Sequence, residues 1–347
     1  MEQDKSNRIE YIDAMRGMTM ILVVYFHVAA YPFGSYEIGY NTIIELFRMP
    51  VFFFISGWLF YKVSRIWNQH EVISMLRKKF MVQIIPTMIF MLLYLTIFNL
   101  LNLSSFGSDK KGYWFTFVLF EYFVIYILAE ALLNKHNTWR GEARVLAVIL
   151  FFSVSAFYYA KYYTHYSEEL GGWKVVLGVL SYVKIRHIIF FWFGTLVRKH
   201  FDKFIAITNN SFFMAAILVL FISIISWPAI LSTEGVEYFA YVAAGLSGII
   251  IVFTFFRLLS ATFSQETWYG RSLQFIGRRT LDIYLIHYFL LPFDLDINDT
   301  WLTQSNAVYV PTALVLSLLV IAICLAISHI IRLSPFLAKY LFGVKAV

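Results

Sequence analysis

The sequence predicts an all-α fold, a polytopic transmembrane helix bundle of about ten spans with both termini cytoplasmic. Three observations predict it: an apolar composition, apolar runs that recur along the chain, and basic residues grouped between those runs. The 347 residues are 60% hydrophobic and 14% charged, whereas soluble domains are roughly 45–50% apolar and about 25% charged. So large an excess of apolar residues is expected when lipid, rather than water, covers most of the outer surface.

The apolar runs place the spans, since a helix needs about 20 residues to cross a bilayer core of about 30 Å. Three of the runs are short, and these helices are expected to tilt or to be buried by their neighbours. The first run is expected to be a retained helix, because no small-residue cleavage site follows it and many further spans do. The predicted spans are 12–31, 46–62, 81–101, 113–133, 145–163, 186–198, 210–231, 238–258, 280–294 and 308–331.

The distribution of Lys and Arg predicts the orientation. With the N-terminus inside, 21 of the 28 basic residues lie on the inner side and 7 on the outer side, which is the bias of cytoplasmic loops. The net charge of +7 is spread over these short clusters instead of forming one patch. We therefore expect membrane lipid as a partner and no nucleic acid.

No linker, low-complexity tract or internal repeat interrupts the spans, so residues 1–347 are expected to form a single transmembrane domain without a soluble domain. The one cysteine, Cys324, lies within an apolar run and excludes a disulfide framework within the chain. The eight histidines show no metal-ligand spacing, and no Walker loop or nucleophile elbow is present. We therefore expect no metal and no tightly bound cofactor. Self-association into a homo-oligomer is left open.

Arg16 and His27 lie eleven residues apart on the first predicted span. Eleven steps of about 100° end about 20° past three full turns, so both side chains are expected on one helix face, roughly 16–17 Å apart along the axis. Imidazole exchanges protons near neutrality, and a cation at the inner edge suits a phosphorylated cytosolic donor. The alternative is an interfacial anchor at Arg16 and a histidine at position 27 that bonds a neighbouring carbonyl.

Two further segments could bind such a donor. Ser56 and Gly57, within an apolar helix, allow close approach by another helix or by a thin ligand. A basic cluster before Pro86 could bind phosphates at the inner surface or simply set the orientation; it consists of Arg77, Lys78 and Lys79.

Several other polar residues lie within or beside the apolar runs, where ionisable groups are expensive and often functional. Tyr284 and His287 are three residues apart and share a helix face, whereas Asp282 and His287 are five apart and do not. Glu121, which follows Trp114 on the fourth predicted span, could pair with a buried Arg or His for structural or for catalytic reasons.

The chain resembles the acyltransferase-3 family of integral membrane O-acyltransferases, because four segments occur in that family's order over nearly the whole length of the chain. They are Tyr11-Ile12-Asp13-x-x-Arg16-Gly17 running into His27; Met49-Pro50-x-Phe52-Phe53-Phe54-x-Ser56-Gly57; the cluster from Arg77 to Lys79 leading to Pro86; and Leu281-x-Ile283-Tyr284-Leu285-x-His287. The chain departs from the pattern at Arg48, where relatives often have histidine before Met-Pro. We also expect no fused extracytoplasmic hydrolase-like domain.

The resemblance implies an acyl-CoA co-substrate taken from the cytoplasm, with acetyl as the family-level expectation, and a carbohydrate or lipid-linked glycan acceptor. It implies His27 and Arg16 as catalytic residues, in a multi-pass protein of a bacterial inner or plasma membrane. Donor binding is expected at Arg16, Ser56, Gly57, Arg77, Lys78 and Lys79. Acceptor-side or supporting roles are expected for Asp13, Arg48, Trp114, Glu121, Tyr284 and His287.

On this hypothesis His27 acts as general base toward the acceptor hydroxyl, and the thioester arm passes between helices where Ser56 and Gly57 leave room. An acyl-imidazole intermediate on His27 is left open. Two other functions remain as alternatives. A transporter or flippase of a glycan precursor would have inverted repeats, which we do not find, and a non-catalytic scaffold or sensor would tolerate replacement of both Arg16 and His27.

Overall fold

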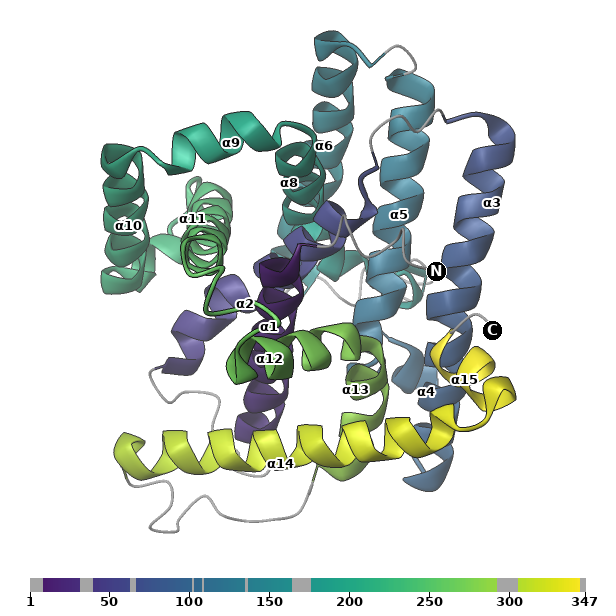
Figure 1. The fold of residues 1–347 in the computed structure, drawn as a ribbon. Helices are drawn as coiled ribbons and strands as arrows, with labels where there is room; N and C mark the ends of the chain where they lie inside the picture. Colours follow the sequence, from purple (N-terminus) through teal and green to yellow (C-terminus); the bar gives the residue numbers. More distant parts are fainter. Residues whose placement is uncertain are drawn as a thin grey trace. The chain divides into compact units, whose positions relative to one another are not determined.

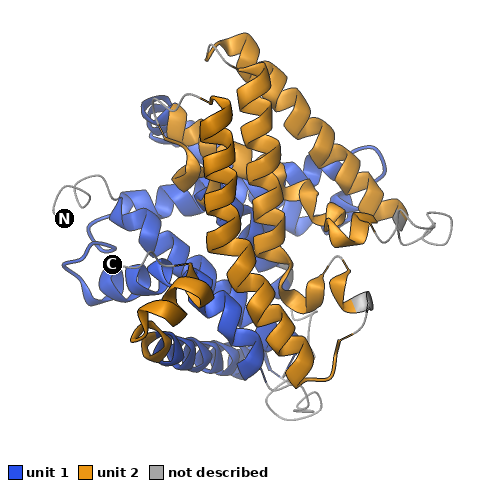
Figure 2. Cartoon of the chain, turned by 90° about the vertical axis from the view of Figure 1, so that its right-hand side faces the viewer, with its two compact units in different colours: residues 1–55, 200–328 blue, residues 56–199, 329–347 orange. Residues whose placement is uncertain are grey.

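The computed structural model describes residues 9–31, 40–62, 67–101, 103–107, 109–134, 137–163, 176–291 and 305–343. Within these ranges the chain is helical and contains no β-strand, which confirms the predicted all-α class (Figure 1). The chain divides into two compact units, one of residues 1–55 and 200–328 and the other of residues 56–199 and 329–347 (Figure 2). Each unit is described by itself, and the single domain stays a prediction.

Unit 1 is built from the N-terminal helix and a series from the second half of the chain. Its helices are α1 (Glu10–Ala30), most of α2 (Tyr40–Phe60), α9 (Phe201–Thr208), α10 (Ser211–Ser226), α11 (Glu237–Leu258), α12 (Trp268–Arg278), α13 (Thr280–Ile286) and most of α14 (Asn306–Arg332). Unit 2 contains the end of α2, α3 (Gln69–Lys79), α4 (Ile85–Ile97), α5 (Trp114–Leu133), α6 (Trp139–Tyr163), α8 (Ile188–Lys199) and α15 (Pro335–Phe342).

Among the described residues, seven helices are long and apolar enough to cross a membrane, or eight if the pair α9 and α10, bent by 80°, forms one span. The chain is therefore a multi-pass membrane protein. Two of the ten expected spans are shorter helices. The segment 186–198 overlaps the 12-residue α8, Ile188–Lys199, and 280–294 contains an apolar helix over Thr280–Leu290. At about 1.5 Å per residue, 12 residues extend about 18 Å, less than a bilayer core.

The third span differs most from its predicted limits. The helix runs from Gln69 to Ile97: the polar α3 is joined to the apolar α4 by a π-helical turn over Phe80–Ile84. The helix therefore begins twelve residues before the expected span of 81–101. Pro86 lies in the first turn of α4 and does not end the helix, since a proline in the first turn needs no backbone donor. The basic cluster consequently lies on this long helix, not in a loop before it.

Glycines set the packing in unit 1. A Cβ at Gly17 would lie 2.0 Å from the Leu273 carbonyl oxygen, and one at Gly277 would lie 2.0 Å from the Asp13 carbonyl oxygen. Helices α1 and α12 therefore cross with backbones in contact, as small residues allow in membrane proteins. Helix packing therefore explains why a glycine, Gly17, follows Arg16 in the opening motif.

Candidate active site

The central feature of unit 1 is a pair of imidazoles from α1 and from the short helix η6 (His287–Leu290). His27 Nδ1 lies 3.0 Å from His287 Nε2, although 260 residues separate them. His27 lies on the last turn of the uninterrupted α1, and His287 is fully buried. The Tyr288 hydroxyl lies 3.2 Å from the other nitrogen of His27, Nε2.

The hydrogen bonds indicate which nitrogen of each imidazole ring carries the proton. His287 Nδ1 lies 2.8 Å from the Tyr284 carbonyl oxygen and 3.0 Å from that of Ile283. Since a carbonyl only accepts, His287 Nδ1 carries a proton, and neutral His287 then accepts at Nε2 from His27 Nδ1–H. In neutral His27 the remaining nitrogen, Nε2, keeps its lone pair. The arrangement therefore presents a basic nitrogen whose orientation is fixed by a second histidine.

Arg48, from α2, adds a buried cation to the same unit. Its guanidinium carbon lies 3.7 Å from the centroid of the Phe26 ring, and the side chain is 6% exposed. Arg48 interacts electrostatically with His27 and Tyr288. Its Nε and Nη1 atoms are buried without a hydrogen-bond partner. Below, His27, His287, Tyr288 and Arg48 are called the imidazole cluster.

The remaining residues of the opening motif lie on the same helix. Arg16 and His27 both belong to the continuous α1, so the helical geometry behind their predicted common face applies. Arg16 is half-buried and Asp13 is buried. The donor-binding role of Arg16 and the supporting role of Asp13 stay predictions.

Apart from Arg16 of unit 1, the residues expected to bind the donor belong to unit 2. A Cβ at Gly57 would lie 1.9 Å from the Phe191 carbonyl oxygen, so α8 occupies the room expected for a thioester arm there, and Gly57 serves helix packing. Ser56 is half-buried. Arg77 and Lys78 are exposed on α3, whereas Lys79 directs its ammonium to the Phe123 ring, 4.0 Å from its centroid.

Two predicted acceptor-side residues, Trp114 and Glu121, lie on α5 in unit 2. The Lys184 ammonium lies 4.9 Å from the Trp114 ring centroid and 2.8 Å from Asp109. Glu121 Oε2 is buried without a hydrogen-bond partner, and Glu121 interacts electrostatically with Lys110. Glu121 was expected to pair with a buried Arg or His. The cation with which it interacts is a lysine instead.

Lys110 lies before the α5 span and is 5% exposed. Its ammonium contacts the Ser181 hydroxyl at 2.5 Å and the carbonyl oxygens of Gly107 and Gly178 at 3.4 Å. Burial lowers the pKa of Lys110 to about 8. Both Lys110 and Ser181 have positive φ, 43° and 50°, which costs a non-glycine residue energy. Lys110 therefore acts as a strained clamp between two loops.

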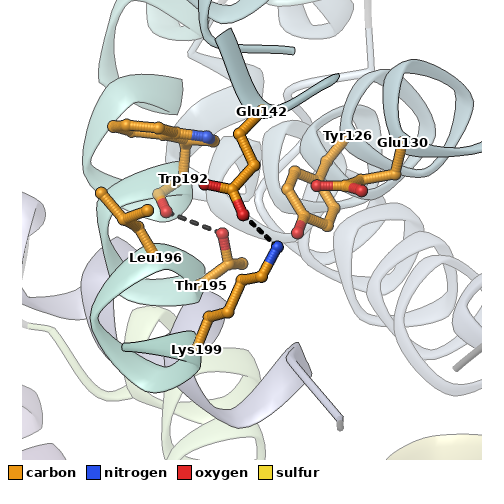
Figure 3. Close-up of a pocket in the computed structure, with 7 residues that line it drawn as sticks. All are labelled: Tyr126, Glu130, Glu142, Trp192, Thr195, Leu196 and Lys199. Atoms are coloured by element: carbon orange, nitrogen blue, oxygen red, sulfur yellow. Dashed lines mark hydrogen bonds and ion pairs between the residues drawn. The ribbon is translucent and has the colours of Figure 1, made fainter. Parts of the chain in front are cut away.

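A second polar cluster of unit 2 surrounds a small pocket lined by Tyr126, Glu130, Glu142, Trp192, Thr195, Leu196 and Lys199 (Figure 3). Lys199 forms an ion pair with Glu142 and donates to Asn137 Oδ1 at 2.5 Å. Asn134 donates to Glu130 at 2.9 Å, and the Thr195 hydroxyl donates to the Trp192 carbonyl. The charged groups satisfy one another, so this Lys199 network connects helices instead of presenting free groups.

Sequence reasoning did not single out Tyr288 or Phe26, although each is adjacent in sequence to a predicted site histidine. A polar aromatic directly after His287, in a segment that contains Tyr284, was the available signal for Tyr288. The predicted contact between Tyr284 and His287 is present, with ring centroids 6.1 Å apart. Asp282, as its spacing predicts, contacts Ser328 at 2.5 Å instead of His287.

Comparison with known proteins shows which family the chain belongs to. A family model described as an acyltransferase domain, Acyl_transf_3, matches residues 9–329, which is nearly the whole chain. No match was found among curated proteins or among solved structures.

Proposed function

Since this membrane protein belongs to the acyltransferase-3 family and is an acyltransferase by that membership, we propose that it acts on a hydroxyl of a cell-envelope or extracellular carbohydrate. The donor is a cytoplasmic acyl-CoA, preferably acetyl-CoA, and the membrane is a bacterial inner or plasma membrane. The acceptor is a free or lipid-linked glycan. The observation that carries the proposal is the hydrogen-bond chain from the carbonyl groups of Ile283 and Tyr284 through His287 to His27.

In this reaction His27 is the general base. Its Nε2 lone pair accepts the proton of the acceptor hydroxyl, whose oxygen forms a bond to the carbonyl carbon of the thioester. The carbon–sulfur bond then breaks, and the sulfur leaves as the CoA thiol after taking the proton from His27 Nε2. General base catalysis contributes typically about 10²–10⁴-fold. His287 positions the ring, because it holds His27 Nδ1.

The donor phosphates are assigned to the cations of the predicted inner surface. Arg77 and Lys78 are exposed and can contact phosphate without displacing a packed partner. Lys79 is committed to the Phe60 and Phe123 rings and supports the helix that carries its neighbours. Arg16 serves the same donor from α1.

The test uses the purified full chain in lipid vesicles with radiolabelled acetyl-CoA and the oligosaccharide of the host envelope. Wild-type protein transfers base-labile label to carbohydrate, with a mass increase of one acetyl group per site. His27→Gln lowers the rate at least about 100-fold, whereas the matched control His70→Gln, at an exposed position on α3, keeps it. Equal rates for the two folded variants would remove His27 from the mechanism. If the protein consumes acetyl-CoA but no label reaches the carbohydrate, the proposed carbohydrate acceptor is wrong.

A further inference from the structure

Arg48 is a buried cation, and two of its donor nitrogens have no hydrogen-bond partner. The side chain is 6% exposed, and its Nε and Nη1 atoms have no hydrogen-bond partner. Buried polar groups in native proteins are nearly always hydrogen-bonded, and each exception calls for an explanation. A buried charge without a partner costs still more. The fold therefore maintains this guanidinium at a cost that packing alone does not explain.

The neighbours of Arg48 do not remove that cost. The Phe26 ring covers one face of the guanidinium at 3.7 Å, but a ring face accepts no in-plane N–H hydrogen bond. Glu45, one turn earlier on α2, interacts with Arg48 electrostatically, but its side chain is exposed. No carboxylate of the described residues lies within 4.0 Å to form an ion pair with it. Two N–H donor groups, Nε and Nη1, which point in different directions, thus lack an oxygen partner. Guanidinium donors suit an anionic oxygen.

The location of Arg48 identifies which oxygen this is. Arg48 interacts electrostatically with His27 and Tyr288, and Tyr288 is hydrogen-bonded to the basic nitrogen of His27. The Arg48 guanidinium also packs on Phe26, the residue before His27, so the unpartnered donors belong to a cation close in the fold to the proposed base. In transfer to a hydroxyl, negative charge develops on the thioester carbonyl oxygen, within a few ångströms of that hydroxyl. A remote carboxylate of the substrate would not require a cation at this position.

We infer that Arg48 is a catalytic residue that binds the thioester carbonyl oxygen and stabilises the oxyanion formed when the acceptor hydroxyl attacks. This inference rests on the proposed function. As the new carbon–oxygen bond forms, the π electrons of the carbonyl move to its oxygen, which accepts a hydrogen bond from one of the two unpartnered Arg48 groups, Nε–H or Nη1–H. When the carbonyl re-forms, the carbon–sulfur bond breaks and the CoA thiol leaves with the proton that His27 had taken.

The experiment measures kcat and KM for acetyl-CoA in the full chain, with Arg48→Gln and Arg48→Lys beside wild type. Loss of an oxyanion donor lowers kcat by about 10²–10³-fold. We expect that loss for Arg48→Gln, a smaller loss for Arg48→Lys, which keeps the charge without the planar edge, and a KM within about threefold of wild type. The matched control is Arg271→Gln, an exposed arginine of α12 in the same unit, which keeps wild-type kinetics.

A purely structural role is separated by chemical rescue. Millimolar guanidinium chloride restores part of kcat to Arg48→Ala and does nothing for His27→Gln, because only the former lacks a guanidinium. If Arg48→Gln and Arg48→Ala do not fold, the kcat of Arg48→Lys is the deciding measurement: a lowered value supports the inference and the wild-type value overturns it. Wild-type kcat in a folded Arg48 variant overturns the inference, as does a loss confined to KM. A loss seen only with succinyl-CoA also overturns it, since Arg48 would then bind a substrate carboxylate. An inactive wild type refutes the proposed function instead.

Discussion

The imidazole cluster of unit 1 and the Lys199 network of unit 2 are both partly buried sets of polar side chains on transmembrane helices, yet they differ in how their groups are used. In the Lys199 network every cation has an anionic or amide partner: Lys199 pairs with Glu142 and Asn137, and Glu130 accepts from Asn134. In the imidazole cluster, Arg48 leaves two donor nitrogens without a partner, and the His27 Nε2 lone pair lies 3.2 Å from the Tyr288 hydroxyl.

This difference indicates a structural role for the Lys199 network and a catalytic role for the imidazole cluster. A satisfied polar network stabilises the contact between the helices that contribute to it, and a reagent would have to break it before it could react. An unsatisfied buried group costs free energy and is retained where a substrate or a transition state supplies the missing partner. We therefore expect mutations in the imidazole cluster of unit 1 to lower the transfer rate, and mutations in the Lys199 network of unit 2 to lower stability.

After His27 and Arg48, the largest effect is expected from His287, which tests whether a second histidine positions His27. His287→Leu removes the acceptor for His27 Nδ1–H and lowers the transfer rate about 10–100-fold, in line with the loss of a group that orients a catalytic imidazole. His287→Gln supplies a carbonyl oxygen near that position and restores a substantial part of the rate. Initial rates at saturating donor provide the measurement. Equal rates for the two variants would mean that His287 does not orient His27.

The second effect is on stability in unit 2. Lys199→Met leaves the Glu142 carboxylate without its cation, so the free energy of unfolding falls by about 1–3 kcal/mol, while the transfer rate per folded molecule stays at the wild-type value. Thermal unfolding in detergent, combined with the activity assay, measures both quantities. Lys203→Met, at an exposed position on α9, is the control and keeps both. A folded Lys199→Met protein without activity would contradict the structural role of the network.

Much of the fold was predictable from sequence, because lipid exposure dictates composition directly. The span expected at 12–31 is α1, Glu10–Ala30, and that at 238–258 is α11, Glu237–Leu258. The helix that contains the third span begins twelve residues before the expected span, because α3 is not an apolar run and a π turn leaves no trace in hydropathy.

The candidate site was only half predictable. Helical spacing brings Tyr284 to His287, but nothing in the sequence brings together His27 and His287, which are 260 residues apart. That contact depends on tertiary packing, including the close crossing of α1 and α12 at Gly17 and Gly277. Spacing also could not decide between ligand room and helix packing at Gly57, since both require the same small residue.

A third effect concerns Lys110, a second buried cation of unit 2 that has partners. Its folded-state pKa, about 8, lies below the ordinary lysine value of about 10.4, so the unfolded chain binds more protons between these values. Stability therefore rises with pH in this window, by about 1 kcal/mol between pH 8 and 9, and the cost of burying the charge is fully present below pH 8.

Lys110→Met abolishes this rise, because methionine does not titrate, whereas Lys111→Met, at the exposed neighbouring position, retains it. The measurement is the free energy of unfolding in detergent at pH 8 and pH 9 for the three proteins. A rise of the same size in Lys110→Met would assign the pH dependence to another group.

The smallest effect is expected from Tyr288. Its hydroxyl lies 3.2 Å from His27 Nε2, where an acceptor hydroxyl would have to lie to give up its proton. Tyr288→Phe removes a competing donor and a polar contact, so we expect a change of about threefold or less in kcat, with the fold intact. Steady-state kinetics at neutral pH measure it. A loss of 100-fold or more would make Tyr288 part of the proton path itself.

The protonation of the two ring nitrogens of His27 tests the central claim most directly. Nitrogen-15 NMR of histidine-labelled protein, with the His27 signals identified by their loss in His27→Gln, distinguishes a protonated from an unprotonated ring nitrogen. The hydrogen bonds through His287 predict a proton on Nδ1 and a lone pair on Nε2 at neutral pH, and loss of this preference in His287→Leu. A proton on Nε2 with a bare Nδ1 in the wild-type protein would contradict the assignment of His27 Nε2 as the catalytic base.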